Sequence, residues 1–174
     1  MIHYTLPIIK KTIISASPII VSTPFAALGL TTFDKDEERA LWQPPNYVFG
    51  IVWPTLYFLL FTLNWNVLSS VVLDNNFKKK FINYTIIESI LQGTWLYNFR
   101  YKKSIKGREK KQYFYGLIST NMLVFLTYTN LYHLISAKNK IYILLYTPYF
   151  LWIQLANILN YQLYFGFTKN KLKQ

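Results

Sequence analysis

Five long apolar blocks alternate with short polar connections along the 174 residues of the chain. Each block holds roughly the 20 residues that an α-helix needs to cross the hydrocarbon core of a bilayer. The approximate bounds of the blocks are 12–30, 48–72, 81–101, 113–134 and 141–168. The pattern therefore predicts an all-α protein with a single integral membrane domain over residues 1–174, built as a bundle of five transmembrane helices.

Prolines modify the first of these blocks. Lys10 and Lys11 precede it, and Pro18 and Pro24 lie within it. Because proline lacks an amide hydrogen and its ring clashes with the preceding turn, we expect a kinked helix whose freed carbonyls need partners inside the protein. A signal peptide cleaved near Ala26 is the alternative, although the block is long for one and four further blocks follow.

Basic residues outnumber acidic residues by 19 to 7, which gives the chain a formal net charge of +12. They lie mainly between the apolar blocks, so we interpret them as membrane-flanking charge and expect no nucleic-acid partner. With five crossings, seven of them lie on the side of the N-terminus and twelve on the opposite side. The positive-inside rule then predicts a cytosolic C-terminus.

The chain contains no cysteine and two widely separated histidines, His3 and His133. These counts exclude a disulfide framework, a thiolate metal site and a cysteine nucleophile, and we expect no metal and no covalent cofactor. His133 lies near the end of the fourth block. We interpret it as a hydrogen-bonded residue near the membrane surface rather than as a haem ligand.

Aromatic residues recur at helical spacing after the double proline Pro44–Pro45. A helix is expected to begin just after these prolines, with Asn46 as its cap. Phe49, Trp53 and Tyr57 then follow at intervals of four residues, which places their rings along one stripe of the helix. The stripe is either a wall that faces a ligand or an interfacial anchor combined with ordinary helix packing.

An acidic residue, Glu88, lies inside the third apolar block. Gln92, Trp95 and Phe99 follow it on the same helical face. A carboxylate at that depth is costly, so we expect Glu88 to face the bundle interior and to be at least partly protonated near neutral pH. Two interpretations remain for it: a group that lines a cavity, or a structural hydrogen bond to another helix.

Polar residues in the second and fourth blocks are expected to support helix packing. Asn64 continues the face of Trp53 and Tyr57, so it is expected to point into the bundle and form an interhelical hydrogen bond. The fourth block is rich in Ser, Thr and Asn, which permit close helix contacts. We interpret it as a packing face.

Trp152, Ala156, Leu159 and Asn160 share one face of the fifth block. Ala156 leaves room for the close approach of a neighbouring helix or of a flat ligand. At ~1.5 Å of rise per residue, Trp53 and Trp152 lie roughly 10 and 16 Å inside opposite faces of the membrane. In a hydrocarbon core ~30 Å thick the two indoles reach similar depths, so they can wall one cavity.

Two sequence patterns near opposite ends of the chain are specific. Residues 42–57 fit W-x-P-P-x-x-x-F-x-x-V-W-x-x-L-Y at every fixed position. Residues 148–160 fit P-Y-x-x-W-x-x-F-A-x-x-L-N with a departure at Leu155. In these two patterns the chain resembles the translocator protein family (TspO/MBR, the peripheral benzodiazepine receptor family).

The third block matches the family only in part. Trp95 and Phe99 fit the family pattern L-N-x-x-W-S-x-x-F-F, whereas Gln92 replaces its Asn and Arg100 replaces its second Phe. The first connection also lacks the Trp-Tyr pair and the Lys-Pro step that the family usually has there.

The resemblance implies a homodimeric receptor or transporter that lies in membrane lipid and binds tetrapyrroles, such as protoporphyrin IX or haem, and sterols. In a eukaryotic host it implies the mitochondrial outer membrane or another intracellular membrane. The ligand cavity is expected among the first, second, third and fifth helices. The expected ligand-binding residues are Phe49, Trp53, Tyr57, Glu88, Gln92, Trp95, Trp152, Ala156 and Asn160.

Two other functions stay open. Some relatives are implicated in light-dependent breakdown of porphyrin, and the tryptophans held responsible match Trp53 and Trp152, which would then be catalytic. A structural membrane protein without a ligand is the other alternative. A separate sterol contact is suggested by Leu159, Tyr164 and Lys169, which fit the loose cholesterol-recognition pattern.

Overall fold

Six α-helices and no β-strand make up the described part of the chain in a computed structural model of the protein. The structure describes residues 7–30, 39–100 and 109–166. The helices are α1 (Ile8–Ser15), α2 (Ser17–Leu30), α3 (Asn46–Ser69), α4 (Asn75–Arg100), α5 (Glu109–Ser136) and α6 (Lys140–Phe165). The all-α prediction is confirmed.

Two of these helices are long and apolar enough to cross a membrane, over Tyr47–Ser69 in α3 and over Lys140–Phe165 in α6. They correspond to the second and fifth predicted spans. The count of five spans stays a prediction. Large apolar side chains on the outside of several helices are exposed, as expected of a surface that faces lipid. Among them are Ile51, Phe58, Phe125, Leu144 and Leu151.

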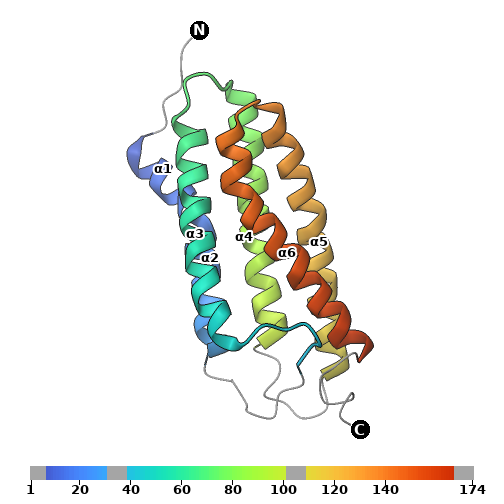
Figure 1. The fold of residues 1–174 in the computed structure, drawn as a ribbon. Coiled ribbons are helices and arrows are strands. Elements are labelled where there is room, and N and C mark those ends of the chain that lie inside the picture. Colours follow the sequence, from blue (N-terminus) through green and yellow to red (C-terminus); the bar gives the residue numbers. More distant parts are fainter. Residues whose placement is uncertain (1–6, 31–38, 101–108, 167–174) are drawn as a thin grey trace.

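The helices form a closed ring. Contacts join α2 to α4, α4 to α5, α5 to α6, α6 to α3 and α3 back to α2, while the short α1 packs on α3. Figure 1 shows that α3 and α5 begin, and α2, α4 and α6 end, at the same end of the bundle. From α2 to α6, helices that follow one another along the chain therefore run in opposite directions, as short connections require.

The first predicted span is two helices rather than one kinked helix. The break lies at Ala16, two residues before Pro18, and α2 continues through Pro24. Pro18 has no amide hydrogen to give to the carbonyl of Ile14, which explains why α1 ends here. The break leaves the carbonyl of Ser15 without a helical partner.

Asn64 of α3 supplies the missing partner. Its Nδ2 donates to the backbone oxygen of Ser15 at 3.2 Å, and both residues are buried. The prediction that Asn64 points into the bundle and bonds to another helix is confirmed. A helix break inside the bundle is thus tolerated because a side chain from a different helix satisfies the freed carbonyl.

Replacing Asn64 with leucine is expected to lower the free energy of unfolding by about 1–3 kcal/mol, because the carbonyl of Ser15 is left buried and unpaired. Thermal unfolding in detergent micelles measures the loss. Asn66→Leu is the matched control: Asn66 is exposed and bonds to Thr62 of its own helix. The control is expected to change stability by less than about 0.5 kcal/mol. Equal effects of the two variants would contradict this role of Asn64.

Capping residues set the ends of the other helices. Pro45 is the N-cap of α3 and Asn46 its first residue, so the helix begins directly after the double proline but the prediction of Asn46 as its cap is wrong. Asp74 accepts a hydrogen bond from the amide of Phe77 at 2.7 Å, and α4 therefore starts six residues earlier than predicted. Gly166, with φ of 77°, ends α6 at Phe165 rather than near residue 168.

Candidate ligand-binding site

Five aromatic rings from three helices contact one another and form what we call the aromatic cluster; one of these residues is buried and four are half-buried. They are Phe49, Trp53 and Tyr57 of α3, Trp95 of α4 and Trp152 of α6. The ring centroid of Trp53 lies 5.6 Å from Tyr57, 6.1 Å from Trp95 and 6.3 Å from Trp152. Trp53 is therefore the centre of the cluster, and its predicted proximity to Trp152 is confirmed.

Hydrogen bonds hold the edge of the aromatic cluster. Gln92 donates from Nε2 to the hydroxyl oxygen of Tyr57 at 2.8 Å. The Trp95 indole N–H donates to Oδ1 of Asn160 at 3.4 Å, and Asn160 in turn donates to the carbonyl of Ala156 at 2.7 Å. These bonds link α4 to α3 and to α6, so they fix the orientation of the rings that they hold.

The indole of Trp152 is held differently. It packs edge-on against Phe49 at 5.4 Å and against Trp53 at an interplanar angle of 89°. Its Nε1 atom is buried and has no hydrogen-bond partner among the residues that the structure describes. A buried N–H without an acceptor is unfavourable, so this atom is a donor available to a bound molecule.

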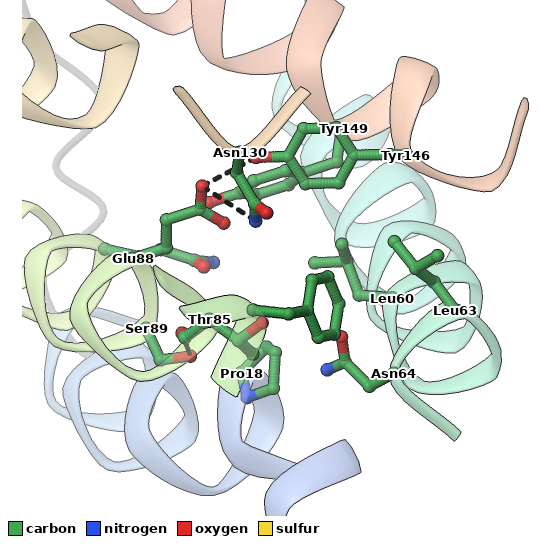
Figure 2. Close-up of a pocket in the computed structure, with 12 residues that line it drawn as sticks. Pro18, Leu60, Leu63, Asn64, Thr85, Glu88, Ser89, Asn130, Tyr146 and Tyr149 are labelled. Atoms are coloured by element: carbon green, nitrogen blue, oxygen red, sulfur yellow. Dashed lines mark hydrogen bonds between the residues drawn. The ribbon is translucent and has the colours of Figure 1, made fainter. Parts of the chain in front are cut away.

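Glu88 belongs to a second, polar group of residues. Its Oε1 atom accepts a hydrogen bond from the Tyr146 hydroxyl at 2.6 Å and another from Nδ2 of Asn130 at 3.3 Å. All three side chains are buried. Figure 2 shows these bonds joining α4, α5 and α6. The structural interpretation of Glu88, a hydrogen bond to another helix, is therefore confirmed.

A small space, called the polar cavity here, lies beside Glu88. Its volume is ≈ 10 Å³, and Glu88, Gln92, Asn130, Tyr146 and Tyr149 are among the residues that line it (Figure 2). Glu88 thus lines a cavity as well as bonding to other helices. A space of this volume has room for about one water molecule and is far too small for a tetrapyrrole.

Sequence comparison with known proteins identifies the family. The sequence model of the TspO/MBR family matches residues 16–165, which is most of the chain. This chain belongs to the TspO/MBR family. It is also similar to the tryptophan-rich protein TspO of Archaeoglobus fulgidus, with 27% identity over 141 residues that cover 80% of this chain and 83% of the relative. No solved structure gives a significant match.

Family membership together with the two apolar helices makes this a TspO-like membrane protein. The match includes all five rings of the aromatic cluster and the residues of the polar cavity. It begins at residue 16, where the chain breaks between α1 and α2, so α1 lies outside it.

Two of the predicted sterol-contact residues of this TspO/MBR-family protein belong to a second hydrophobic cluster, against which Phe49 also packs. Leu159 is buried against Ala40 and Tyr113, whereas Tyr164 is half-buried. Lys169 lies outside the described residues, so the sterol contact stays a prediction. The side chain of Phe99 is also outside what the structure describes.

Three functional candidates were missed by sequence reasoning: Asn130, Tyr146 and Tyr149. Tyr146 and Tyr149 lie on the same face of α6 as Ile153 and Ala156, at helical spacing. That spacing could have predicted from the sequence that the two tyrosine hydroxyls continue the face of Trp152 and Ala156 along the helix. Asn130 carries no such signal, because the fourth block contains many polar residues.

The interpretations of α5 hold. The Thr120 hydroxyl donates to Oδ1 of Asn157 at 2.8 Å, and Nδ2 of Asn157 donates to Asn121 at 3.2 Å, so polar side chains of α5 pack against α6. His133 stacks on Phe77 at 3.9 Å, and its Nε2 lies 3.1 Å from the Phe77 carbonyl. This contact fits the interpretation of His133 as a hydrogen-bonded residue.

Proposed function

We propose that this protein is a membrane receptor or transporter for tetrapyrroles such as protoporphyrin IX or haem, which it binds at the aromatic cluster. The observation that carries the proposal is the mutual contact of five aromatic rings from α3, α4 and α6, namely Phe49, Trp53, Tyr57, Trp95 and Trp152. A flat apolar macrocycle gains most from large aromatic faces, and sites for such ligands are mostly apolar with a few placed polar groups.

Polar atoms at the cluster suit the edge of such a ligand. The unpaired N–H of Trp152 is a donor for a propionate carboxylate or another acceptor. Gln92 and Asn160 lie at the border of the cluster and bond to Tyr57 and Trp95. These amides can exchange their present partners for polar groups of the ligand. Together they supply the few directional contacts that orient a largely apolar molecule.

Binding between the two central indoles requires them to move. The centroids of Trp53 and Trp152 are 6.3 Å apart and the rings are perpendicular. A macrocycle stacked between two rings needs about 7 Å, twice the van der Waals separation of about 3.5 Å, and parallel rings. We propose that the Trp152 indole, which has no hydrogen bond on its Nε1 in the described part of the chain, turns to accept the ligand.

A second candidate function is light-driven oxidation of bound porphyrin. Its specific support is the row of oxidisable rings Tyr57, Trp53 and Trp152, with successive centroids 5.6 and 6.3 Å apart. In this function Trp53 and Trp152 are catalytic: an indole gives one electron to the photo-excited ligand and becomes a radical cation. The reduced ligand then reacts with dissolved dioxygen, which is the oxidant. No residue beyond these rings is assigned a chemical role.

The finer features of the proposal follow from the family and the charges. We propose a homodimer, a C-terminus in the cytosol and, in a eukaryotic host, the mitochondrial outer membrane or another intracellular membrane. Twelve of the nineteen basic residues lie on the side of the C-terminus if the chain crosses five times. We also propose sterols as ligands, with Leu159, Tyr164 and Lys169 as the contact.

Titration of the purified protein with protoporphyrin IX in the dark, followed by tryptophan fluorescence, tests the receptor function. Saturable quenching is expected in the wild type. Trp152→Ala is expected to weaken binding at least about tenfold, since a lost aromatic face and donor exceed the 1.4 kcal/mol that tenfold represents. Trp65→Ala is the control, because Trp65 stacks on Phe61 at 6.2 Å, twelve residues along α3 from Trp53.

The same titration separates the three functions. Unchanged porphyrin affinity in Trp152→Ala, or equal weakening by Trp65→Ala, would contradict binding at the aromatic cluster. Absence of saturable quenching in the wild type would favour a structural membrane protein, in which truncating Trp152 changes stability alone. Loss of the porphyrin absorbance under illumination, and not in the dark, would favour the oxidative function.

A further inference from the structure

The polar cavity lies where all five helices of the ring meet. Pro18 comes from α2, Asn64 from α3, Glu88 from α4, Asn130 from α5 and Tyr149 from α6 (Figure 2). Its volume of ≈ 10 Å³ is about that of one water molecule. A space that is polar, enclosed by five helices and this small is suited to a single small polar molecule.

Asn130 brings an unpaired hydrogen-bonding atom to this cavity. Its side chain is 1% exposed, its Nδ2 donates to Glu88, and its Oδ1 has no hydrogen-bond partner in the described part of the chain. In Figure 2 the amide of Asn130 points into the space beside Glu88. Turning the amide by half a rotation exchanges its two ends and leaves the other end unpaired instead. In both orientations one end needs a partner that the described side chains do not provide.

Two of the neighbouring hydroxyl groups, those of Ser89 and Tyr146, donate their hydrogens elsewhere. Ser89 donates to the carbonyl of Thr85 at 2.7 Å. Tyr146 donates to Glu88 at 2.6 Å. Neither can give the same hydrogen to Asn130, since a hydroxyl has one to donate. No described group forms a hydrogen bond with Oδ1 of Asn130, so a donor molecule in the cavity would satisfy this atom.

We propose that the polar cavity holds one ordered water molecule, which donates to Oδ1 of Asn130 and hydrogen-bonds to the Glu88 carboxyl. Buried waters typically make two to four hydrogen bonds to otherwise unpaired polar groups, and the side chains around this cavity offer that number. The water completes a hydrogen-bonded connection among α4, α5 and α6 at the centre of the bundle. This inference does not rest on tetrapyrrole binding.

The donors around the cavity favour water over a metal cation. Oε1 of Glu88 already accepts two hydrogen bonds from neutral groups. Calcium and magnesium require about six or more oxygen ligands, which exceeds what a space for one water provides. The described residues also contain no cluster of three or more His, Cys, Asp or Glu side chains.

The water site adjoins the aromatic cluster through the side chain of Gln92. Gln92 lines the polar cavity and donates to the hydroxyl oxygen of Tyr57. Tyr57 lies 5.6 Å from Trp53. The two sites share Gln92, but the polar cavity is proposed to bind water and the aromatic cluster a tetrapyrrole.

Nuclear magnetic resonance of protein labelled at its threonine methyl groups, in nanodiscs, tests the inference. Thr85 lines the polar cavity and is 5% exposed, whereas Thr120 is 0% exposed and bonds to Asn157, away from it. A cross-peak between water and the Thr85 methyl group, with the sign of a long-lived contact, is expected. No such peak is expected for Thr120, which is the control in the same spectrum.

Asn130→Leu removes the unpaired amide and is expected to abolish the Thr85 cross-peak while leaving the Thr120 signal unchanged. A wild-type spectrum without the Thr85 cross-peak would overturn the proposal, whether or not the variant folds. Persistence of the peak in folded Asn130→Leu would overturn it as well. If the Thr85 signal shifts on addition of sodium chloride but not of choline chloride, the cavity binds a cation rather than water, and the proposal is overturned.

Discussion

Replacement of both Trp53 and Trp152 by phenylalanine is expected to keep most of the affinity for protoporphyrin IX and to abolish any light-driven loss of the bound porphyrin. Phenylalanine retains a flat apolar face but is much harder to oxidise than indole. The two rings lie 6.3 Å apart, so either indole can supply an electron when the other is removed. The double variant is therefore the informative one, and each single variant is expected to retain part of the loss.

Porphyrin absorbance, recorded during illumination in air-saturated buffer, measures the result. The matched control is Trp65→Phe, which removes one indole from α3 outside the aromatic cluster and is expected to behave as the wild type. Undiminished breakdown in the double variant would contradict the oxidative function and leave the receptor function standing. Loss of porphyrin affinity in the double variant would instead show that phenylalanine cannot replace the two indoles in binding, and the single variants would then identify which indole is required.

The aromatic cluster could be predicted because the positions of its rings depend mainly on residue spacing along single helices. Phe49, Trp53 and Tyr57 recur every four residues, so helical periodicity alone places them on one stripe. The depth of Trp53 and Trp152 follows from the number of residues between each ring and its helix start, at a constant rise. The structure agrees, with the indoles 6.3 Å apart. Such quantities depend on one helix at a time.

The polar cavity could not be predicted in the same way. Whether Glu88 contacts Tyr146 and Asn130 depends on how α4, α5 and α6 are rotated about their own axes, and periodicity does not give that rotation. Many Ser, Thr and Asn residues on α5 were equally plausible partners. The pairing that forms is the one that leaves the buried carboxyl with two donors.

The break between α1 and α2 shows the same limit. Pro18 signals a disturbance of the helix, but its outcome depends on what lies beside the freed carbonyl. In this bundle Asn64 of α3 reaches Ser15, so the chain can break at Ala16 without leaving that group unpaired. Pro18 therefore located the disturbance of the helix. The contact between Ser15 and Asn64, 49 residues apart in sequence, allowed it to be a complete break.

Removal of the Glu88 side chain is expected to destabilise the bundle more than any other single change at the polar cavity. Glu88→Leu leaves the Tyr146 hydroxyl and the Asn130 amide without their shared acceptor. At about 1–3 kcal/mol for each of these two buried unpaired groups, the free energy of unfolding is expected to fall by about 2–6 kcal/mol. Glu88→Gln keeps an acceptor oxygen at the same position and is expected to cost about 1 kcal/mol or less, since both partners of Glu88 are neutral.

A double-mutant cycle of Glu88→Leu with Tyr146→Phe, measured by unfolding in detergent micelles, isolates the contribution of the hydrogen bond between them. Interhelical hydrogen bonds in membranes typically couple by about 0.6 kcal/mol and by at most about 1.7 kcal/mol. The 2.6 Å distance and full burial of this pair favour the upper part of that range. Zero coupling would show that the bond contributes nothing to stability. Unfolding of Glu88→Gln would show that the carboxyl is charged and paired, because an amide could not replace it.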